Sequence, residues 1–296
     1  MRFANSPICA VAGFAVLALV VPTIAFAAPA GSSTITSAFY LDIGASASLG
    51  FQPTPVDPHG QHTDNGYSDY LVAREASKGI TLQLDEIGCD NETTWSMING
   101  NDDCYVAPDS QLAEAVAFLS GHLDESGLVT VDLGFNDILQ CFSYPDVDRT
   151  CVAQKIDMVR EQMPIILSQL KAVAGPDVTF VGVGHYDPYL ADALYGATGR
   201  RFADESRWAI IHLDHALRDV YGSEDMPMAD VGSAFATNDT ELVTLTGIGA
   251  VPDNVAEVCL LTWMCQPAPY GPNIHPNGAG YEAIADAIAA VLPAPW

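Results

Sequence analysis

Residues 128–134 read LVTVDLG and residues 178–184 read VTFVGVG. Both are short, mostly apolar runs, as expected of strands that are buried on both faces of a sheet. Between them, residues 151–173 (CVAQKIDMVREQMPIILSQLKAV) have the spacing of a long helix, which Pro164 is expected to kink or divide. A strand, a helix and a second strand in this order predict a parallel sheet with helices on its faces.

The same alternation continues on both sides of this unit. Further strands are predicted at residues 39–44, 80–87 and 226–231, and further helices at residues 67–77, 111–122, 202–221 and 278–292. With 296 residues, 49% of them hydrophobic, the chain can bury one large core. The sequence therefore predicts an α/β fold that is flavodoxin-like, with three layers (α/β/α) around a central, mostly parallel sheet.

The first 27 residues have the pattern of a secretory signal peptide. Arg2 supplies one positive charge, residues 8–21 are apolar, and residues 25–27 (AFA) form the small-x-small pattern that signal peptidase cleaves. Residues 3–30 carry no charge and are long enough to span a bilayer, so a retained anchor is the alternative. The prolines and small residues at the end of this run favour cleavage. We expect a signal peptide at 1–27, a single domain at 28–296 and a secreted, extracellular protein.

The cysteine pattern agrees with export. Cys9 lies in the signal segment, and the other six cysteines allow 15 disulfide connectivities. Six free thiols in a cytosolic protein are the alternative, which the signal segment disfavours. The six fall into three close pairs along the chain, so local pairing is the simplest hypothesis: Cys89 with Cys104, Cys141 with Cys151, and Cys259 with Cys265.

The chain is strongly acidic, with 11 basic and 37 acidic residues and a formal net charge of −26. A surface of this charge repels nucleic acids and anionic membranes. We therefore expect no nucleic-acid partner, and no stable membrane anchoring once the signal is cleaved.

Three predicted loops carry reactive or polar groups where ligands bind in parallel α/β sheets, beyond the carboxyl ends of strands. They are residues 44–46 (GAS), 88–91 (GCDN) and 134–137 (GFND). Ser46 has small neighbours that would leave its Oγ accessible, and the amide of Asn136 could donate to an oxyanion. His275 precedes the last predicted helix and could reach the same pocket. Taken singly, these residues have commoner roles, as a solvated serine, a turn asparagine and a surface histidine.

Four short motifs, in this order along the chain, resemble the sequence blocks of the GDSL/SGNH hydrolases. Residues 44–50 (GASASLG) match Gly-Asp-Ser-x-x-x-Gly except at the second position, and residues 134–137 match Gly-x-Asn-Asp fully. Residues 275–281 (HPNGAGY) match a histidine followed by Pro-x-x-x-Gly-Tyr. Residues 88–94 (GCDNETT) resemble Gly-Cys-x-Gly-Glu-Thr-Thr of the secreted actinobacterial-type esterase and lipase branch. The resemblance extends over about residues 39–292 and implies the same three local disulfides.

The resemblance implies a secreted serine esterase or lipase that hydrolyses carboxylic esters through an acyl-enzyme. Ser46 would be the nucleophile and His275 its base. The backbone N–H groups of Ser46 and Asn91 and the side-chain amide of Asn136 would hold the oxyanion. No metal and no cofactor is expected, and the partner is a small-molecule, lipid or glycan ester. Because the base must be neutral, activity is expected to rise with pH through the histidine titration rather than stay flat between about pH 5 and 9.

Three positions depart from the family's motifs. Ala45 replaces an aspartate that supports the nucleophile loop. Asn91 replaces the glycine of the oxyanion hole, and its side chain is expected to crowd or polarise that hole. The family's acid usually lies three residues before the histidine, where this chain has Pro272, with Asn273 next. We expect the carbonyl of Pro272 to hold the imidazole N–H of His275, as in the Ser-His dyads of the secreted branch.

Two other functions are compatible with this sequence. The departures fit a catalytically inactive secreted binding protein, because fold does not fix function; the joint presence of Ser46, Asn136 and His275 favours an enzyme. A carbohydrate deacetylase would use the same machinery, and a small acyl pocket with an open sugar groove would favour it. Some aromatic side chains near the motifs could line an acyl pocket or belong to the core: Phe51, Trp95, Phe135, Phe142 and Tyr186.

Overall fold

A computed structural model of the chain describes residues 35–296, apart from 102 and 295. The expected signal peptide at residues 1–27 lies outside this described part. The described residues form one compact unit. Among the described helices, none combines the length and the apolar composition that a membrane span requires.

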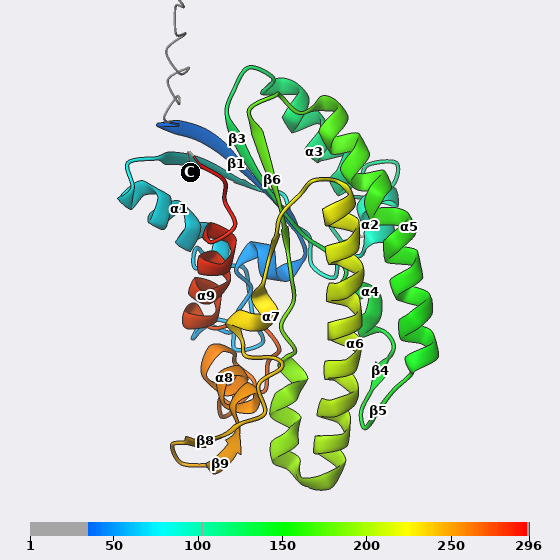
Figure 1. Ribbon diagram of the computed structural model, residues 1–296, viewed down its shortest axis with the longest axis vertical. Helices are drawn as coiled ribbons and strands as arrows, with labels where there is room; N and C mark the ends of the chain where they lie inside the picture. The colour runs from blue at the N-terminus through cyan, green and yellow to red at the C-terminus, as the bar shows by residue number, and fades with distance from the viewer. Residues whose placement is uncertain (1–34, 102, 295) are drawn as a thin grey trace, which may run out of the picture. The chain divides into compact units, whose positions relative to one another are not determined.

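Five strands form a central sheet in which every neighbouring pair is parallel (Figure 1). Their spatial order is β2-β1-β3-β6-β7, which is the order 2-1-3-4-5 of flavodoxin-like sheets. This confirms the predicted fold class. The strand order reverses between β1 and β3, so a ligand site is expected beyond the carboxyl ends of these two strands. The strands are β1 (Ser37–Gly44), β2 (Thr81–Glu86), β3 (Gly127–Asp132), β6 (Val178–Val183) and β7 (Met228–Ala229).

Alternate side chains of β1 enter two separate hydrophobic cores, because successive residues of a strand face opposite ways. Phe39, Leu41 and Ile43 pack in one core, and Ala38 and Tyr40 pack in the other. Figure 1 shows the corresponding helices on the two sides of the sheet. The first core includes α3 (Gln111–Gly121), α5 (Arg149–Val173) and α6 (Gly196–Ser223), and the second includes α1 (Tyr67–Ser77) and α9 (Gly278–Ala289).

Shorter elements connect these layers. Two of them start directly beyond β1 and β3, where the sequence places two of the motifs: the 3-10 helix η1 (Ser46–Leu49) and the helix α4 (Phe135–Leu139). The others are α2 (Thr94–Asn99), η2 (Pro188–Tyr195), α7 (Val231–Ala234), α8 (Asp253–Leu261), the hairpin of β4 (Phe142–Ser143) and β5 (Asp146–Val147), and the hairpin of β8 (Leu242–Leu245) and β9 (Gly249–Pro252).

The long helix α5 is not divided at Pro164, so the predicted division is wrong, while the alternative of a kink stays a prediction. Side chains on both sides of the proline are buried in the same core, Val159 and Met163 before it and Ile166 and Leu170 after it. This shared burial outweighs the roughly 3 kcal/mol that an internal proline costs a helix. The last predicted strand, at 226–231, is also shorter than expected, because only two residues pair in β7.

Three disulfides link the cysteines in the predicted local pairs, which confirms that pairing. They join Cys89 to Cys104, Cys141 to Cys151, and Cys259 to Cys265. Disulfides of this kind persist in oxidising compartments, so they fit an extracellular protein.

Candidate active site

Ser46 is the first residue of η1, two residues beyond the end of β1. Three loops approach one another closely here. A Cβ on Gly44 would lie 2.8 Å from the carbonyl oxygen of Asp132, and a Cβ on Gly88 would lie 2.2 Å from Ser48 Oγ. Only glycine permits this approach at both positions. The approach holds Ser46 at the carboxyl edge of β1 and β3, where the strand order reverses.

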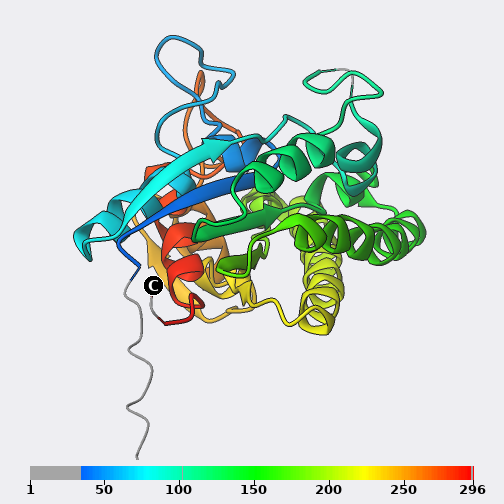
Figure 2. The same ribbon diagram turned by 90° about the horizontal axis from the view of Figure 1, so that it is seen from above.

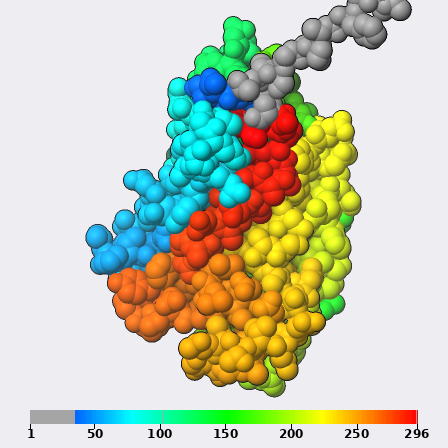
Figure 3. All heavy atoms as spheres, turned by 60° about the vertical axis from the view of Figure 1, so that its left-hand side comes forward, coloured from blue at the N-terminus to red at the C-terminus, as the bar shows by residue number. Residues whose placement is uncertain are grey.

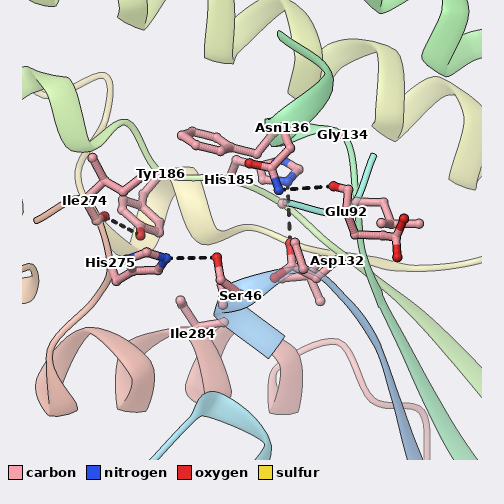
Figure 4. Close-up of a pocket in the computed structure, with 16 residues that line it drawn as sticks. Ser46, Glu92, Asp132, Gly134, Asn136, His185, Tyr186, Ile274, His275 and Ile284 are labelled. Carbon is pink, nitrogen blue, oxygen red and sulfur yellow. Dashed lines mark hydrogen bonds and ion pairs between the residues drawn. The ribbon is translucent and has the colours of Figure 1, made fainter. Parts of the chain in front are cut away.

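His275 lies in the loop between α8 and α9, and its Nε2 is 2.8 Å from Ser46 Oγ (Figure 4). The loop is fixed at both ends. The backbone N–H of Trp263 donates to the carbonyl of His275 at 3.1 Å, and the side chain of Asn277 caps the first turn of α9. The predicted nucleophile and base are therefore in contact, in the arrangement that lets an imidazole take the proton of a serine.

The second imidazole nitrogen of His275 contacts Asn273, not the carbonyl of Pro272. Nδ1 lies 2.8 Å from Asn273 Oδ1, which also accepts the backbone N–H of His275 at 3.0 Å. This corrects the predicted role of Pro272. An asparagine side chain readily accepts the N–H two residues ahead, which brings its oxygen beside the imidazole. The spacing of Asn273 and His275 was the available signal.

The orientation of the Asn273 amide is set by its surroundings. Its Nδ2 donates to the carbonyl of His59 at 3.2 Å, so Oδ1 is the atom that faces His275. In Figures 2 and 3, the loop that holds His59 lies beside the loop that precedes His275. This contact fixes the tautomer of His275 with its Nδ1 protonated and its Nε2 free to accept from Ser46.

Burial lowers the pKa of His275 to about 4, while the charge of Asp90 acts in the opposite direction. The Phe51 ring packs on the imidazole, with ring centroids 4.5 Å apart. The base is therefore neutral over the whole range from about pH 5 upward. This changes the expected pH dependence, because the histidine titration moves below the range in which the sequence placed it.

Asn136 lies in the first turn of α4 and lines the same cavity as Ser46 and His275. One N–H of its amide donates to the backbone carbonyl of Glu92 at 3.1 Å. An asparagine amide has two N–H groups, so the second is left to donate to a ligand. Asn136 therefore keeps a donor for an oxyanion, and this role stays a prediction.

Asn91 adopts a backbone φ of 61°, in the left-handed region that favours glycine and that asparagine tolerates best among other residues. Its side chain is exposed and does not line the cavity, whereas the next residue, Glu92, does. The expected crowding of the oxyanion hole by the Asn91 side chain is therefore wrong. The role of the Asn91 N–H stays a prediction.

Gln111, the first residue of α3, connects the nucleophile loop to the oxyanion loop. Its Oε1 accepts the N–H of Gly44 at 3.0 Å, and its Nε2 donates to the carbonyl of Gly44 at 3.0 Å and to Glu92 Oε2 at 3.1 Å. Burial raises the pKa of Glu92 to about 7, against the hydrogen bonds from Ser96, the Thr93 N–H and Gln111. The sequence offers no signal for Gln111 beyond a polar residue at the start of a helix.

A buried ion cluster lies in the wall of the cavity. His185 Nδ1 contacts Asp214 Oδ1 at 3.1 Å, and His185 Nε2 lies 3.5 Å from Asp132 Oδ1. Burial alone would lower the pKa of His185, but the two carboxylates outweigh it and raise the pKa to about 9. No sequence motif predicts this cluster, because its members are far apart in sequence. Within the described residues, no group of three or more His, Cys, Asp or Glu side chains could hold a metal ion.

The cavity beside Ser46 measures about 60 Å³. Of the five aromatic candidates, Phe135 and Tyr186 line it. The Tyr186 hydroxyl donates to the backbone carbonyl of Ile274, which places the ring next to His275 (Figure 4). The remaining aromatic candidates lie elsewhere: Phe51 on His275, Phe142 among Tyr189 and Phe202, and Trp95 exposed on the surface.

Several solved structures share the fold. Phospholipase A1 from Streptomyces albidoflavus NA297 is 16% identical, with a TM-score of 0.54 over 86% of this chain and 98% of that chain. The lipase Lip_vut3 from a goat rumen metagenome is 14% identical, with a TM-score of 0.54 over 86% and 96%. The extracellular lipase of Streptomyces rimosus is 15% identical, with a TM-score of 0.52 over 85% and 99%. At these identities the likeness shows the fold alone.

The fold and the sequence together define a hydrolase of the GDSL/SGNH class. The GDSL-like lipase/acylhydrolase family matches residues 43–283, and the chain belongs to this family. No curated protein matches the chain significantly.

Proposed function

We propose that the chain is a secreted serine esterase that hydrolyses carboxylic esters through an acyl-enzyme on Ser46. The observation that carries this proposal is the contact of 2.8 Å between Ser46 Oγ and His275 Nε2, together with the Asn273 oxygen on the other imidazole nitrogen. No metal or cofactor takes part in this chemistry.

In the first half of the reaction, Ser46 Oγ attacks the ester carbonyl carbon while His275 Nε2 takes its proton. The oxyanion is held by the backbone N–H groups of Ser46 and Asn91 and by the free amide N–H of Asn136. The intermediate collapses, the carbon–oxygen bond to the alcohol breaks, and the imidazolium protonates the leaving alcohol. Water then attacks the acyl-enzyme with His275 again as base, which releases the acid and restores Ser46.

The location and the partner follow from the same features. The signal pattern at 1–27 and the three disulfides support an extracellular domain from residue 28 to 296. The net charge of −26 disfavours nucleic acid and anionic membranes, so the partner is a small-molecule, lipid or glycan ester.

An inactive binding protein is the second candidate. The contacts of Ser46, His275 and Asn273 count against it, because a binding surface has no need of an oriented imidazole beside a serine hydroxyl. A carbohydrate deacetylase would use the same contacts, and it differs only in the ester that enters the cavity.

The test is hydrolysis of p-nitrophenyl acetate and butyrate by residues 28–296 made in an oxidising host. Ser46→Ala and His275→Ala should each lower kcat/KM by at least about 10³-fold, as expected for a nucleophile and its base. Ser77→Ala and His215→Ala change the same residue types at exposed positions and should match the wild type. The proposal fails if the folded wild type is no faster than Ser46→Ala on any ester, acetylated glycans included.

A further inference from the structure

The cavity beside Ser46 is small. A buried water needs roughly 10–15 Å³ of such space, so the volume of about 60 Å³ holds about four to six heavy atoms. An acetyl or butyryl group falls within this size, and an octanoyl group does not. This narrow part of the cavity therefore favours short acyl groups over long ones.

Most of the cavity lining is apolar, but on the side away from His275 the wall carries two ionic groups, Asp132 and His185 (Figure 4). Asp132 ends β3, His185 follows β6, and Asp214 lies on α6, so three elements of the core hold this cluster in place. His185 is 6% exposed and Asp132 is 8% exposed. His185 Nε2 is buried and meets no hydrogen-bond acceptor at good distance among the described residues.

An alkyl chain that extended toward this wall would cover the carboxylate of Asp132, whose side chain is 10% exposed, with hydrocarbon. Covering a buried polar group without giving it a partner is unfavourable, and more so for a charged group. The cluster cannot be pushed aside easily, because His185 is held through both its backbone N–H and its Nδ1 by Asp214, each at 3.1 Å. The wall therefore limits the chain by charge as well as by volume.

The reaction decides which part of the ester meets this wall. The leaving alcohol must lie near His275, which protonates it. The acyl group then occupies the part of the cavity away from His275, where Asp132 and His185 lie (Figure 4).

We propose that this cavity is a short-acyl pocket closed by Asp132 and His185, which Asp214 holds in place, and that the substrates are esters of acetyl to butyryl groups whose larger alcohol part stays outside. The inference rests on the proposed esterase function and names its substrate class.

The first test is the acyl-chain dependence of the wild type. We measure kcat/KM for p-nitrophenyl acetate, butyrate, octanoate and dodecanoate below their micellar concentrations. We expect kcat/KM to fall at least about tenfold from butyrate to octanoate, since a misfit of even one methylene costs about tenfold or more. Equal or higher kcat/KM for octanoate or dodecanoate would overturn the proposal.

The second test changes the wall. The double variant Asp132→Leu/His185→Phe replaces the ionic wall by apolar groups and should raise the octanoate-to-butyrate ratio of kcat/KM about tenfold. Asp219→Leu/His215→Phe makes the same changes at exposed positions of α6 and should keep the wild-type ratio. An unchanged ratio in the folded double variant would rule out the ionic wall. If that variant does not fold, the wild-type chain series still decides the acyl preference.

A failure of this inference can be told from a failure of the esterase function. Methanesulfonyl fluoride is small enough for the cavity and sulfonylates an activated serine, which intact-mass measurement detects. If it labels the wild type but not Ser46→Ala, while long-chain esters are preferred, only the short-acyl pocket is refuted. If it labels neither and no ester is hydrolysed, the esterase function itself fails.

Discussion

Asn273 occupies the position at the imidazole Nδ1 that a carboxylate holds in a Ser-His-Asp triad. Its neutral oxygen orients His275 but adds no negative charge to stabilise the imidazolium that forms as Ser46 reacts. Burial meanwhile lowers the pKa of His275 to about 4. The site therefore has a well-oriented but weak base, and changes at residue 273 should alter both its orientation and its pKa.

Asn273→Ala should lower kcat/KM roughly ten- to a hundredfold, chiefly through kcat, because the imidazole loses the partner that fixes its tautomer. Asn273→Asp should raise the pKa of His275, since a neighbouring carboxylate favours the imidazolium. The acid limb of the pH profile of kcat/KM for p-nitrophenyl acetate then moves upward. His59→Ala keeps the main-chain carbonyl that Asn273 contacts and serves as the control. Wild-type activity and an unshifted profile in both Asn273 variants would return the orienting role to the Pro272 carbonyl.

The pH dependence of the wild type follows from the pKa of His275. The base is active when neutral, so activity is lost as pH falls through about 4. Between pH 5 and 9 the titration of His275 causes no change in activity. Burial raises the pKa of the Glu92 carboxyl to about 7. The backbone carbonyl of the same residue accepts the Asn136 amide, so the titration of Glu92 is expected to add a second step to the pH profile near pH 7. Glu92→Gln removes such a step and keeps the His275 limb. A single limb near pH 6.5 that survives in Glu92→Gln would contradict the lowered pKa of His275.

The sequence shows which residues form the Ser–His pair, but not all the atoms around it. Ser46, Asn136 and His275 stand in short motifs with fixed spacing, so they could be assigned before the structure. Asn273 could not be preferred over the Pro272 carbonyl, because the choice depends on a side-chain rotamer and on the distant carbonyl of His59.

Among the elements, the start of α3 controls how two loops of the site fit together. Gln111 contacts both backbone groups of Gly44 and the carboxylate of Glu92. Glu92 in turn accepts the Asn136 amide through its carbonyl. A single buried amide thus connects the loop of the nucleophile with the donor of the oxyanion.

Gln111→Met should lower kcat about ten- to a hundredfold with a smaller effect on KM, because the oxyanion donors lose their alignment, which acts in the transition state. Gln111→Glu should be worse at pH 8, where its carboxylate would face Glu92 and the Gly44 carbonyl. It should recover in part at pH 5, where it can be protonated and donate again. Steady-state kinetics at both pH values check this. Gln154→Met makes the same change at an exposed site on α5. Equal losses for Gln111→Met and Gln111→Glu at both pH values would indicate a packing role only.

The elements that could be predicted are those with strong periodicity. The apolar runs of β1, β3 and β6 and the amphipathic α3 and α5 lie close to their predicted ranges. The hairpin of β8 and β9 was not predicted, because its strands are short and much of it is exposed, with only Val243, Leu245 and Val251 packing in a small cluster. The first turns of α6, from Gly196, were missed because Gly196 and Gly199 are poor helix formers and weaken the helical pattern there.

At the scale of the whole molecule, several buried groups stabilise the folded state at low rather than high pH. The carboxylates of Asp132 and Asp214 outweigh burial and raise the pKa of His185 to about 9, so its contribution is complete below the ordinary histidine pKa and lost as pH rises through about 9. Burial raises the pKa of Asp187 and of Glu92 to about 7. The folded chain holds these protons more tightly than the unfolded chain, so stability falls as pH rises through about 7.

We therefore expect a higher Tm at pH 6 than at pH 9, with a difference that has two sources. The first source is the mutual repulsion of the surface charges, which sum to −26. In 0.5 M salt the Debye length is about 4–5 Å, so this contribution to the Tm difference is screened. The second source is the titration of the buried groups, which salt screens much less, so its contribution to the Tm difference persists in 0.5 M salt. Asp187→Asn removes one of these groups and should reduce the Tm difference that persists in salt. The lowered pKa of His275 acts in the opposite direction, lowering stability at acid pH, but only below about pH 6.5. Thermal unfolding at both pH values, in 10 mM and 0.5 M NaCl, measures both parts. A Tm at pH 9 that equals or exceeds the value at pH 6 in 0.5 M NaCl would mean that His185, Asp187 and Glu92 do not hold their protons in the folded state.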